Sequence, residues 1–154
     1  MTRANNLETP IDYQQLVEAL GDAIVVADME GAIQLWNPAA ERLFGFTAAE
    51  AIGKTLDLIV PERYRERHWA GYDRTMATGQ TRYSRDVLRV PALHKDGRPL
   101  SIAFTVGLLY GADRQVTGIV AVVRDDTVAF AEEKKLRRRL AELAGDKARN
   151  NGGE

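Results

Sequence analysis

Residues 37–54 read NPAAERLFGFTAAEAIGK, and this stretch decides the fold. Asn37 followed by Pro38 is a strong helix start, because an Asn side chain caps free backbone N–H groups and Pro suits the first helical position. Thr47 caps a second short helix, which Gly53 ends. The stretch therefore predicts two short consecutive helices.

Segments rich in β-forming residues lie on both sides of these helices. Before them, residues 23–27 and 32–36 flank a short Gly-containing turn and predict a hairpin. After them, residues 61–79 show helical periodicity. Three further strands are predicted at residues 85–93, 100–110 and 117–123, the first two joined by an Asp-Gly turn. This order of elements predicts an α+β domain with an antiparallel sheet.

Two amphipathic helices are expected to flank this domain. Residues 11–20 carry apolar side chains at helical spacing, and Gly21 is expected to end that helix. Leu136, Leu140 and Leu143 are spaced four and three residues apart, which is a fragment of a coiled-coil seam. The apolar residues of both flanks predict a homodimer. The expected limits are a disordered N-terminus at 1–10, a flanking helix at 11–21, the domain at 22–127, a C-terminal coiled-coil helix at 128–145 and a disordered tail at 146–154.

Composition and charge exclude several classes of function. Lys plus Arg total 21 and Asp plus Glu total 22, so the chain lacks the basic surface expected of a nucleic-acid-binding domain. No apolar run is long enough to cross a membrane, and the first ten residues lack the hydrophobic stretch of a signal peptide, so we expect a cytoplasmic protein. The absence of cysteine excludes disulfides, cysteine nucleophiles and thiolate haem ligation. Without a phosphate-binding loop, a zinc-ligand cluster or a catalytic constellation, the chain is not expected to be an enzyme.

The order of elements, together with residues 37–54, KDGRPLSI at 95–102 and VVRDDT at 122–127, resembles the PAS domain family. The resemblance covers about residues 13–127. It implies a PAS fold with a five-stranded antiparallel sheet, helices on one face and a pocket between helices and sheet.

The same family resemblance identifies a signal exit at the end of the last strand. Asp125 and Thr127 match the exit motif, where that strand leads into a signalling helix. Arg124 is placed with Asp125 to tie this junction together. Asp126 stands where an apolar residue is usual, which predicts a looser junction.

The segment RERHWAGYDRTMATG at residues 65–79 resembles the haem-bearing helix of oxygen-sensing PAS domains of the FixL type. This resemblance places His68 at the proximal haem ligand and Arg74 near the haem propionates, with Tyr72 or Arg82 assisting. A neutral imidazole is a good iron ligand, and an Arg fork suits a carboxylate. The implied cofactor is heme b.

The distal side of the implied pocket departs from that family. Leu88 stands where the family has a distal arginine, and Arg89 would point to the other face of the strand. Such an apolar wall would admit CO or NO and would hold a polarised O2 less well. The expected lining residues are Leu88, Ile102, Phe104, Val106 and Trp69.

Three functions stay open on the sequence. The first is a haem-based gas or redox sensor that uses His68. The second is a cofactor-free dimerisation and protein-interaction module, in which His68 is an ordinary helix residue. The third is a receptor for a small ligand such as a fatty acid, a carboxylate or a non-covalent flavin. In each case the signal is expected to leave through the C-terminal helix, towards a protein partner acting in trans or an output domain outside this chain.

Overall fold

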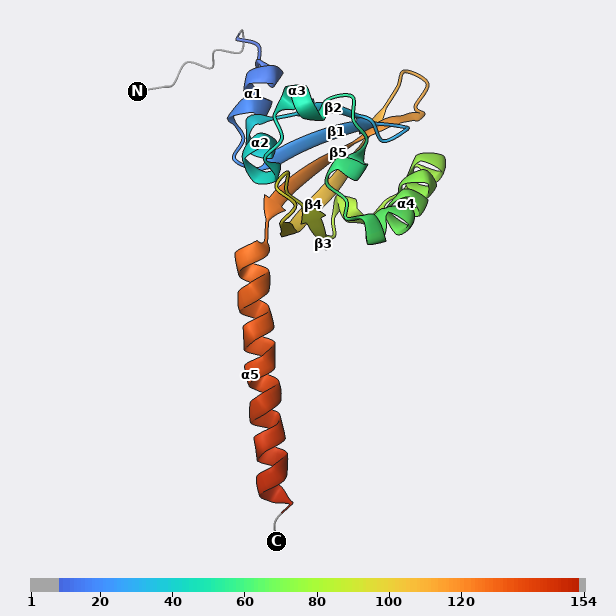
Figure 1. Ribbon diagram of the computed structural model, residues 1–154. Helices are drawn as coiled ribbons and strands as arrows, with labels where there is room; N and C mark the ends of the chain where they lie inside the picture. Colours follow the sequence, from blue (N-terminus) through green and yellow to red (C-terminus); the bar gives the residue numbers. More distant parts are fainter. Residues whose placement is uncertain (1–8, 153–154) are drawn as a thin grey trace, which may run out of the picture.

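A single antiparallel sheet organises the chain, in a computed structural model that describes residues 9–152 (Figure 1). The strand order is β2-β1-β5-β4-β3, and every neighbouring pair is antiparallel. Pairing of the first strand with the last joins the N-terminal hairpin to the C-terminal half, so β5 lies in the middle. The predicted five-stranded antiparallel sheet is confirmed. The strands are β1 (Ala23–Asp28), β2 (Ile33–Trp36), β3 (Leu88–Leu93), β4 (Pro99–Tyr110) and β5 (Val116–Asp125).

Helices connect β2 to β3 and flank the sheet at both ends of the chain. The connecting elements are α2 (Pro38–Phe44), α3 (Ala48–Ala51), a 3-10 turn (Leu56–Leu58), a second 3-10 turn (Glu62–Tyr64), α4 (Arg65–Thr78) and a third 3-10 turn (Arg82–Ser84). The flanking helices are α1 (Tyr13–Ala19) and α5 (Thr127–Asn151). The segment after Pro61 therefore begins as a 3-10 turn, and α4 starts at Arg65. Likewise β3 starts three residues later than predicted, because a 3-10 turn precedes it.

The two helices expected from residues 37–54 form as predicted. The Asn37 side chain accepts a hydrogen bond from the Ala40 N–H and caps α2. Thr47 and Glu50 form a reciprocal capping box at the start of α3. These contacts involve neighbours in the sequence, which is why the sequence pattern alone identified them.

Alternation along the strands separates a core face from an outer face of the sheet. On β4, Leu100 and Ile102 are buried, whereas Ser101 between them is only half-buried. The core-face residues pack beneath α2 and α3 in one hydrophobic cluster. The buried members of that cluster are Ala23, Val25, Ile33, Trp36, Ala40, Phe44, Ala51, Ile59, Ala92, Leu100, Ile102 and Val123.

The hairpin between β3 and β4 is anchored on α2. Gly45 ends α2 with a φ of +83°, and a Cβ at this position would lie 2.5 Å from His94 Cε1. Lys95, the residue after His94, donates its backbone N–H to the Phe44 carbonyl at 2.8 Å. Its Nζ lies 2.6 Å from Glu50 Oε2 on α3. Glycine is therefore required both for the backbone conformation and for the approach of the histidine ring.

The C-terminal helix is longer than predicted. The expected helix at 128–145 is corrected by α5, which runs to Asn151, so the disorder expected from residue 146 is not found through residue 151; residues 153–154 lie outside the described part of the chain. An ion pair between Asp146 and Arg149, 3.3 Å apart, links neighbouring turns in the stretch that was expected to be disordered. Figure 1 shows α5 extending away from the sheet, with most of its length beyond the domain. No helix within residues 9–152 is long and apolar enough to span a membrane. The disorder predicted for 1–10 falls mostly outside the described residues.

Candidate functional site

Three aromatic side chains of α4 form a cluster at the domain surface. The ring centroids of His68 and Trp69 are 4.8 Å apart, those of His68 and Tyr72 5.9 Å, and those of Trp69 and Tyr72 5.4 Å. Residues three and four positions apart on a helix are neighbours on its surface, so Tyr72 lies beside both Trp69 and His68. The structure thus brings the predicted ligand His68 together with two of its predicted neighbours.

The aromatic cluster is anchored on the turn between β1 and β2 and on the 3-10 turn Leu56–Leu58. The Trp69 indole N–H donates to Asp57 Oδ1 at 2.8 Å. The Trp69 ring also covers Gly31, where the φ is +82° and a Cβ would lie 2.2 Å from ring carbons. Tyr72 is buried, and its hydroxyl donates to the Asp28 carbonyl. Burial raises the pKa of the Tyr72 phenol well above its ordinary value, so it stays protonated as a donor.

His68 differs from its two neighbours because its ring lacks such an anchor. Its Nδ1 atom is buried and has no hydrogen-bond partner among the residues that the structure describes. Burial lowers the pKa of His68 below its ordinary value, and the Asp57 carboxylate opposes that shift only in part. The imidazole is therefore neutral at pH 7, with a buried nitrogen whose hydrogen-bonding capacity is unused. Such an atom is uncommon in folded proteins, where buried polar groups are paired with protein, water or a bound group.

The predicted propionate residues are not gathered around His68. Arg74 is exposed, and six residues on a helix correspond to about 600°, which turns its side chain some 120° away from His68. Arg82 lies beyond α4, where it donates to the Tyr83 hydroxyl at 2.8 Å. Of the predicted set, only Tyr72 lies beside His68.

The four strand residues expected to line a pocket all lie on the core face of the sheet. Ile102 and Val106 are buried, and Phe104 and Leu88 are half-buried and directly paired across β4 and β3. Trp69 instead lies on the β1–β2 turn. Their role as a ligand-binding wall remains a prediction.

The signal-exit residues form contacts that the sequence did not predict. Arg124 donates two hydrogen bonds of 3.1 Å to the Asp22 carboxylate, so it ties the end of β5 to the N-terminal flank and not to Asp125. Asp125 accepts from the Thr127 N–H at 2.9 Å. The Thr127 hydroxyl in turn accepts from the Ser101 N–H at 3.1 Å. The junction is thereby fixed to β4.

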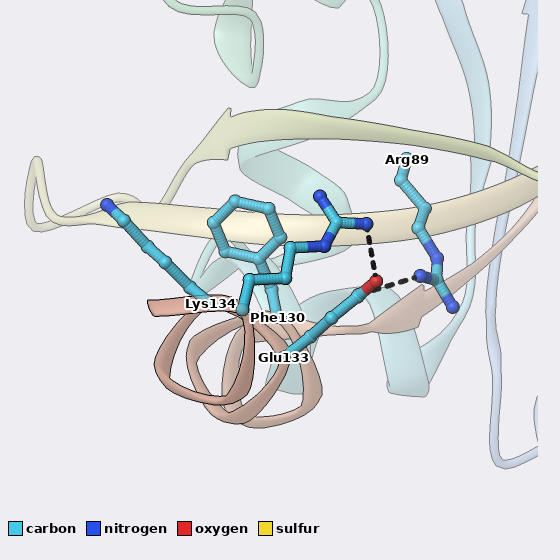
Figure 2. A pocket seen from close by; sticks show the side chains of 5 residues that line it. Arg89, Phe130, Glu133 and Lys134 are labelled. Atoms are coloured by element: carbon cyan, nitrogen blue, oxygen red, sulfur yellow. Dashed lines mark hydrogen bonds and ion pairs between the residues drawn. The ribbon is translucent and has the colours of Figure 1, made fainter. Parts of the chain in front are cut away.

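Asp126, which was expected to loosen this junction, takes part in two contacts there. Its backbone N–H donates to the Ser101 carbonyl at 2.8 Å, and its Oδ2 lies 3.6 Å from Arg89 Nε. The same guanidinium reaches Glu133 on α5, with Arg89 Nη1 3.3 Å from Oε2 (Figure 2). Sequence alternation placed Arg89 on the outer face, yet nothing local to β3 indicated that a helix lies there.

The sequence matches a known protein family over most of its length. The family described as PAS fold matches residues 11–125. The chain belongs to the PAS family. A PAS domain is a sensory and signal-transduction module. An uncharacterised protein of Azorhizobium caulinodans is 36% identical over 118 residues, which are 76% of this chain and 16% of that protein.

Two further relatives are sensors by name. The sensor protein FixL of Bradyrhizobium diazoefficiens is 31% identical over 134 residues, covering 86% of this chain and 25% of FixL. The oxygen sensor protein DosP of Escherichia coli is 26% identical over 137 residues, covering 89% and 17%. The chain thus spans a quarter or less of the curated relatives described here.

Solved structures agree on the fold. The PAS domain of a protein from Colwellia psychrerythraea has a TM-score of 0.66 and 26% identity, covering 75% of this chain and 94% of that one. An RNA-binding light-oxygen-voltage receptor has a TM-score of 0.69 at 21% identity, covering 84% and 36%. The second likeness supports the fold alone.

Proposed function

We propose that this PAS domain is a gas or redox sensor that binds haem through His68. One observation carries the proposal: the buried Nδ1 of His68 lacks a protein partner, while the pKa of the ring is lowered. A neutral imidazole with an unused nitrogen suits an axial iron ligand. The similarity to the sensor protein FixL and the oxygen sensor protein DosP supports a gas-sensing role.

The residues around His68 suggest how a haem would be held. Trp69 and Tyr72 are fixed by hydrogen bonds to Asp57 and Asp28, and so hold the helix that carries His68. Arg74 is exposed and turned away from His68, so contact with a propionate would require its long side chain to extend around α4. Heme b would supply an iron that binds a diatomic gas.

The side chains on the core face of β3 and β4 indicate which gas a haem at this site would retain. Leu88, Ile102, Phe104 and Val106 offer no side-chain hydrogen-bond donor on the core face. A wall of these residues would give a polarised O2 no hydrogen bond, whereas CO and NO would depend less on such a donor. We therefore expect CO or NO to be retained in preference to O2.

Reconstitution with hemin tests the haem proposal. The purified chain, titrated with hemin, should give a Soret band that saturates at one haem per chain, and His68→Ala should shift the band and weaken affinity by tenfold or more. His94→Ala is the matched control, because His94 is the other histidine and packs on Gly45. Absence of stoichiometric uptake, or equal spectra for the parent and His68→Ala, would falsify the assignment. Flavin bands in the purified protein would instead support the small-ligand receptor.

A cofactor-free interaction module is the second candidate, and the exposed leucines of α5 favour it. Leu136, Leu140 and Leu143 are 60%, 60% and 59% exposed, although together they form an apolar seam. In a parallel pair with Leu140 at heptad position a, Glu132 occupies g and Arg137 the following e, so opposite charges meet across the two helices. We therefore propose a homodimer through α5, acting on a protein partner in trans or on an output domain beyond this chain.

Light scattering at micromolar concentration tests the dimer. The parent should give twice the chain mass, and Leu136→Glu with Leu140→Glu should give a monomer. Val128→Glu is the control, because Val128 is 72% exposed but lies off the seam. A monomeric parent, or a leucine double variant that remains dimeric, would rule out this interface.

A further inference from the structure

The outer face of β3 carries an ion-pair contact with α5. Leu88 pairs with Phe104 on the core face, and Arg89, the next residue, points to the opposite face. The Arg89 guanidinium lies within 3.6 Å of Asp126 and 3.3 Å of Glu133. These two carboxylates are seven residues apart, about 10 Å along the chain of a helix. A single side chain therefore contacts both the junction and the second turn of α5.

Apart from such polar contacts, little holds α5 against the sheet. No residue of the helix is buried. A surface hollow of about 280 Å³ lies beside the contact, lined by Arg89, Phe130, Glu133, Lys134 and Arg137. Phe130 remains 47% exposed there. No close-packed apolar interface therefore fixes the direction of the helix.

The two carboxylates respond differently when Arg89 moves away. Glu133 has a second partner within the helix, since its Oε1 lies 2.8 Å from Arg137 Nη2. Asp126 is different: its side chain is 12% exposed, and its Oδ2 is buried without a hydrogen bond among the described residues. Loss of Arg89 would leave this buried charge without its cation, which is costly. The contact with Asp126 therefore favours the state in which Arg89 stays bound to both carboxylates, whereas Arg137 can replace Arg89 as the partner of Glu133.

We propose that Arg89 is a latch that sets the direction of α5 and that displacement of β3 opens it. The hydrogen bonds of the Asp126 backbone N–H and the Thr127 hydroxyl to the Ser101 backbone keep the junction attached in both states, so it acts as a hinge. An occupant on the core face that moves Leu88 also moves Arg89 relative to its carboxylates, because the two residues are adjacent in one strand. Only this last step rests on the proposed sensory function.

Spin-label distances test the latch directly in the full chain without any cofactor. The sequence has no cysteine, so Ala49→Cys on α3 and Glu142→Cys on α5, both exposed, carry labels at defined sites. Pulsed electron resonance on labelled chain diluted with excess unlabelled chain reports the intramolecular distance. We expect one narrow distribution in the parent and, in Arg89→Gln, a distribution at least twice as broad or shifted by several ångströms.

Two further variants test whether a change in the distance distribution comes from the contacts of Arg89. Arg124→Gln is the control, because Arg124 also lies on the outer face but contacts Asp22 and not α5. Asp126→Asn with Glu133→Gln removes the same contacts from the helix side, and should reproduce the effect even if Arg89→Gln misfolds by circular dichroism. A distribution that stays narrow in the folded variants, or an equal change in Arg124→Gln, would overturn the latch. Neither result bears on haem binding, which has its own spectral test.

Discussion

Replacing Asn37 by alanine should destabilise this domain far more than the loss of an ordinary helix cap. Asn37 is 3% exposed, and its Oδ1 accepts from the backbone N–H groups of Ile24, at 2.9 Å, and Ala40, at 3.0 Å. Its Nδ2 donates to the carbonyls of Val17, at 3.0 Å, and Asp22, at 3.1 Å. One amide thus joins α1, β1 and α2.

The magnitude follows from these four bonds. Loss of the cap costs about 1 kcal/mol. The buried Ile24 N–H, left unpaired, adds about 1–3 kcal/mol. The carbonyls of Val17 and Asp22 are only partly buried, so water can replace much of what they lose. We expect a loss of about 3 kcal/mol, which corresponds to a decrease in Tm of about 6–12 °C for a chain of this size.

Urea unfolding followed by circular dichroism measures this change. Asn150→Ala is the control, because it makes the same substitution at an exposed position of α5 and should change stability by less than about 0.5 kcal/mol. Asn37→Asp keeps the acceptor but replaces the donor by a charged oxygen facing two carbonyls, so it should be at least as destabilising as alanine. If Asn37→Asp were as stable as the parent, the hydrogen bonds donated by Nδ2 would contribute nothing to the free energy of unfolding, contrary to this prediction.

Three further predictions concern the site and its surroundings. Gly31→Ala should displace the Trp69 ring, because the new Cβ would overlap it; a Trp fluorescence spectrum and stability identical to those of the parent would contradict this contact. Because burial lowers the pKa of His68 in the folded state, its contribution to stability is fully present above the ordinary pKa of 6.5 and is lost as the pH falls below that value. His68→Gln should therefore flatten the pH dependence of the unfolding free energy below pH 6.5, and an unchanged pH profile would contradict this assignment. Hydrogen bonds from Lys95 and Thr47 lower the pKa of Glu50 to about 2, so Lys95→Met should raise this pKa in an NMR titration, and an unmoved pKa would show that Lys95 is not its main cause.

Much of the fold could be predicted because its signals are local. Asn37 with Pro38 specifies a helix start within one turn, and the Asp-Gly pair at 96–97 specifies a hairpin turn. Alternation along β4 separates core residues from outer residues without knowledge of any partner strand. The family resemblance then added the number of strands and the antiparallel arrangement of the sheet, whereas the strand order came only from the structure.

The candidate site was predicted only in part. His68 was identified by its resemblance to a family motif, but its burial and its unpartnered Nδ1 depend on the packing of α4 against the β1–β2 turn. Arg74 was expected near the haem propionates, but helical geometry turns its side chain away from His68. Gly31, whose missing Cβ makes room for Trp69, gave no sign of this role in the sequence.

The sequence by itself determined the elements, their order and the family, because capping, turn formation and strand alternation act between residues a few positions apart. Only the tertiary structure decided which distant groups meet: Nδ2 of Asn37 with Val17, Arg124 with Asp22, and Arg89 with Glu133. The physical reason is that the reach of a side chain is short, about 3 Å for a hydrogen bond. Partners dozens of residues apart become neighbours only once the sheet has assembled, so their pairing is a property of the fold and not of any segment.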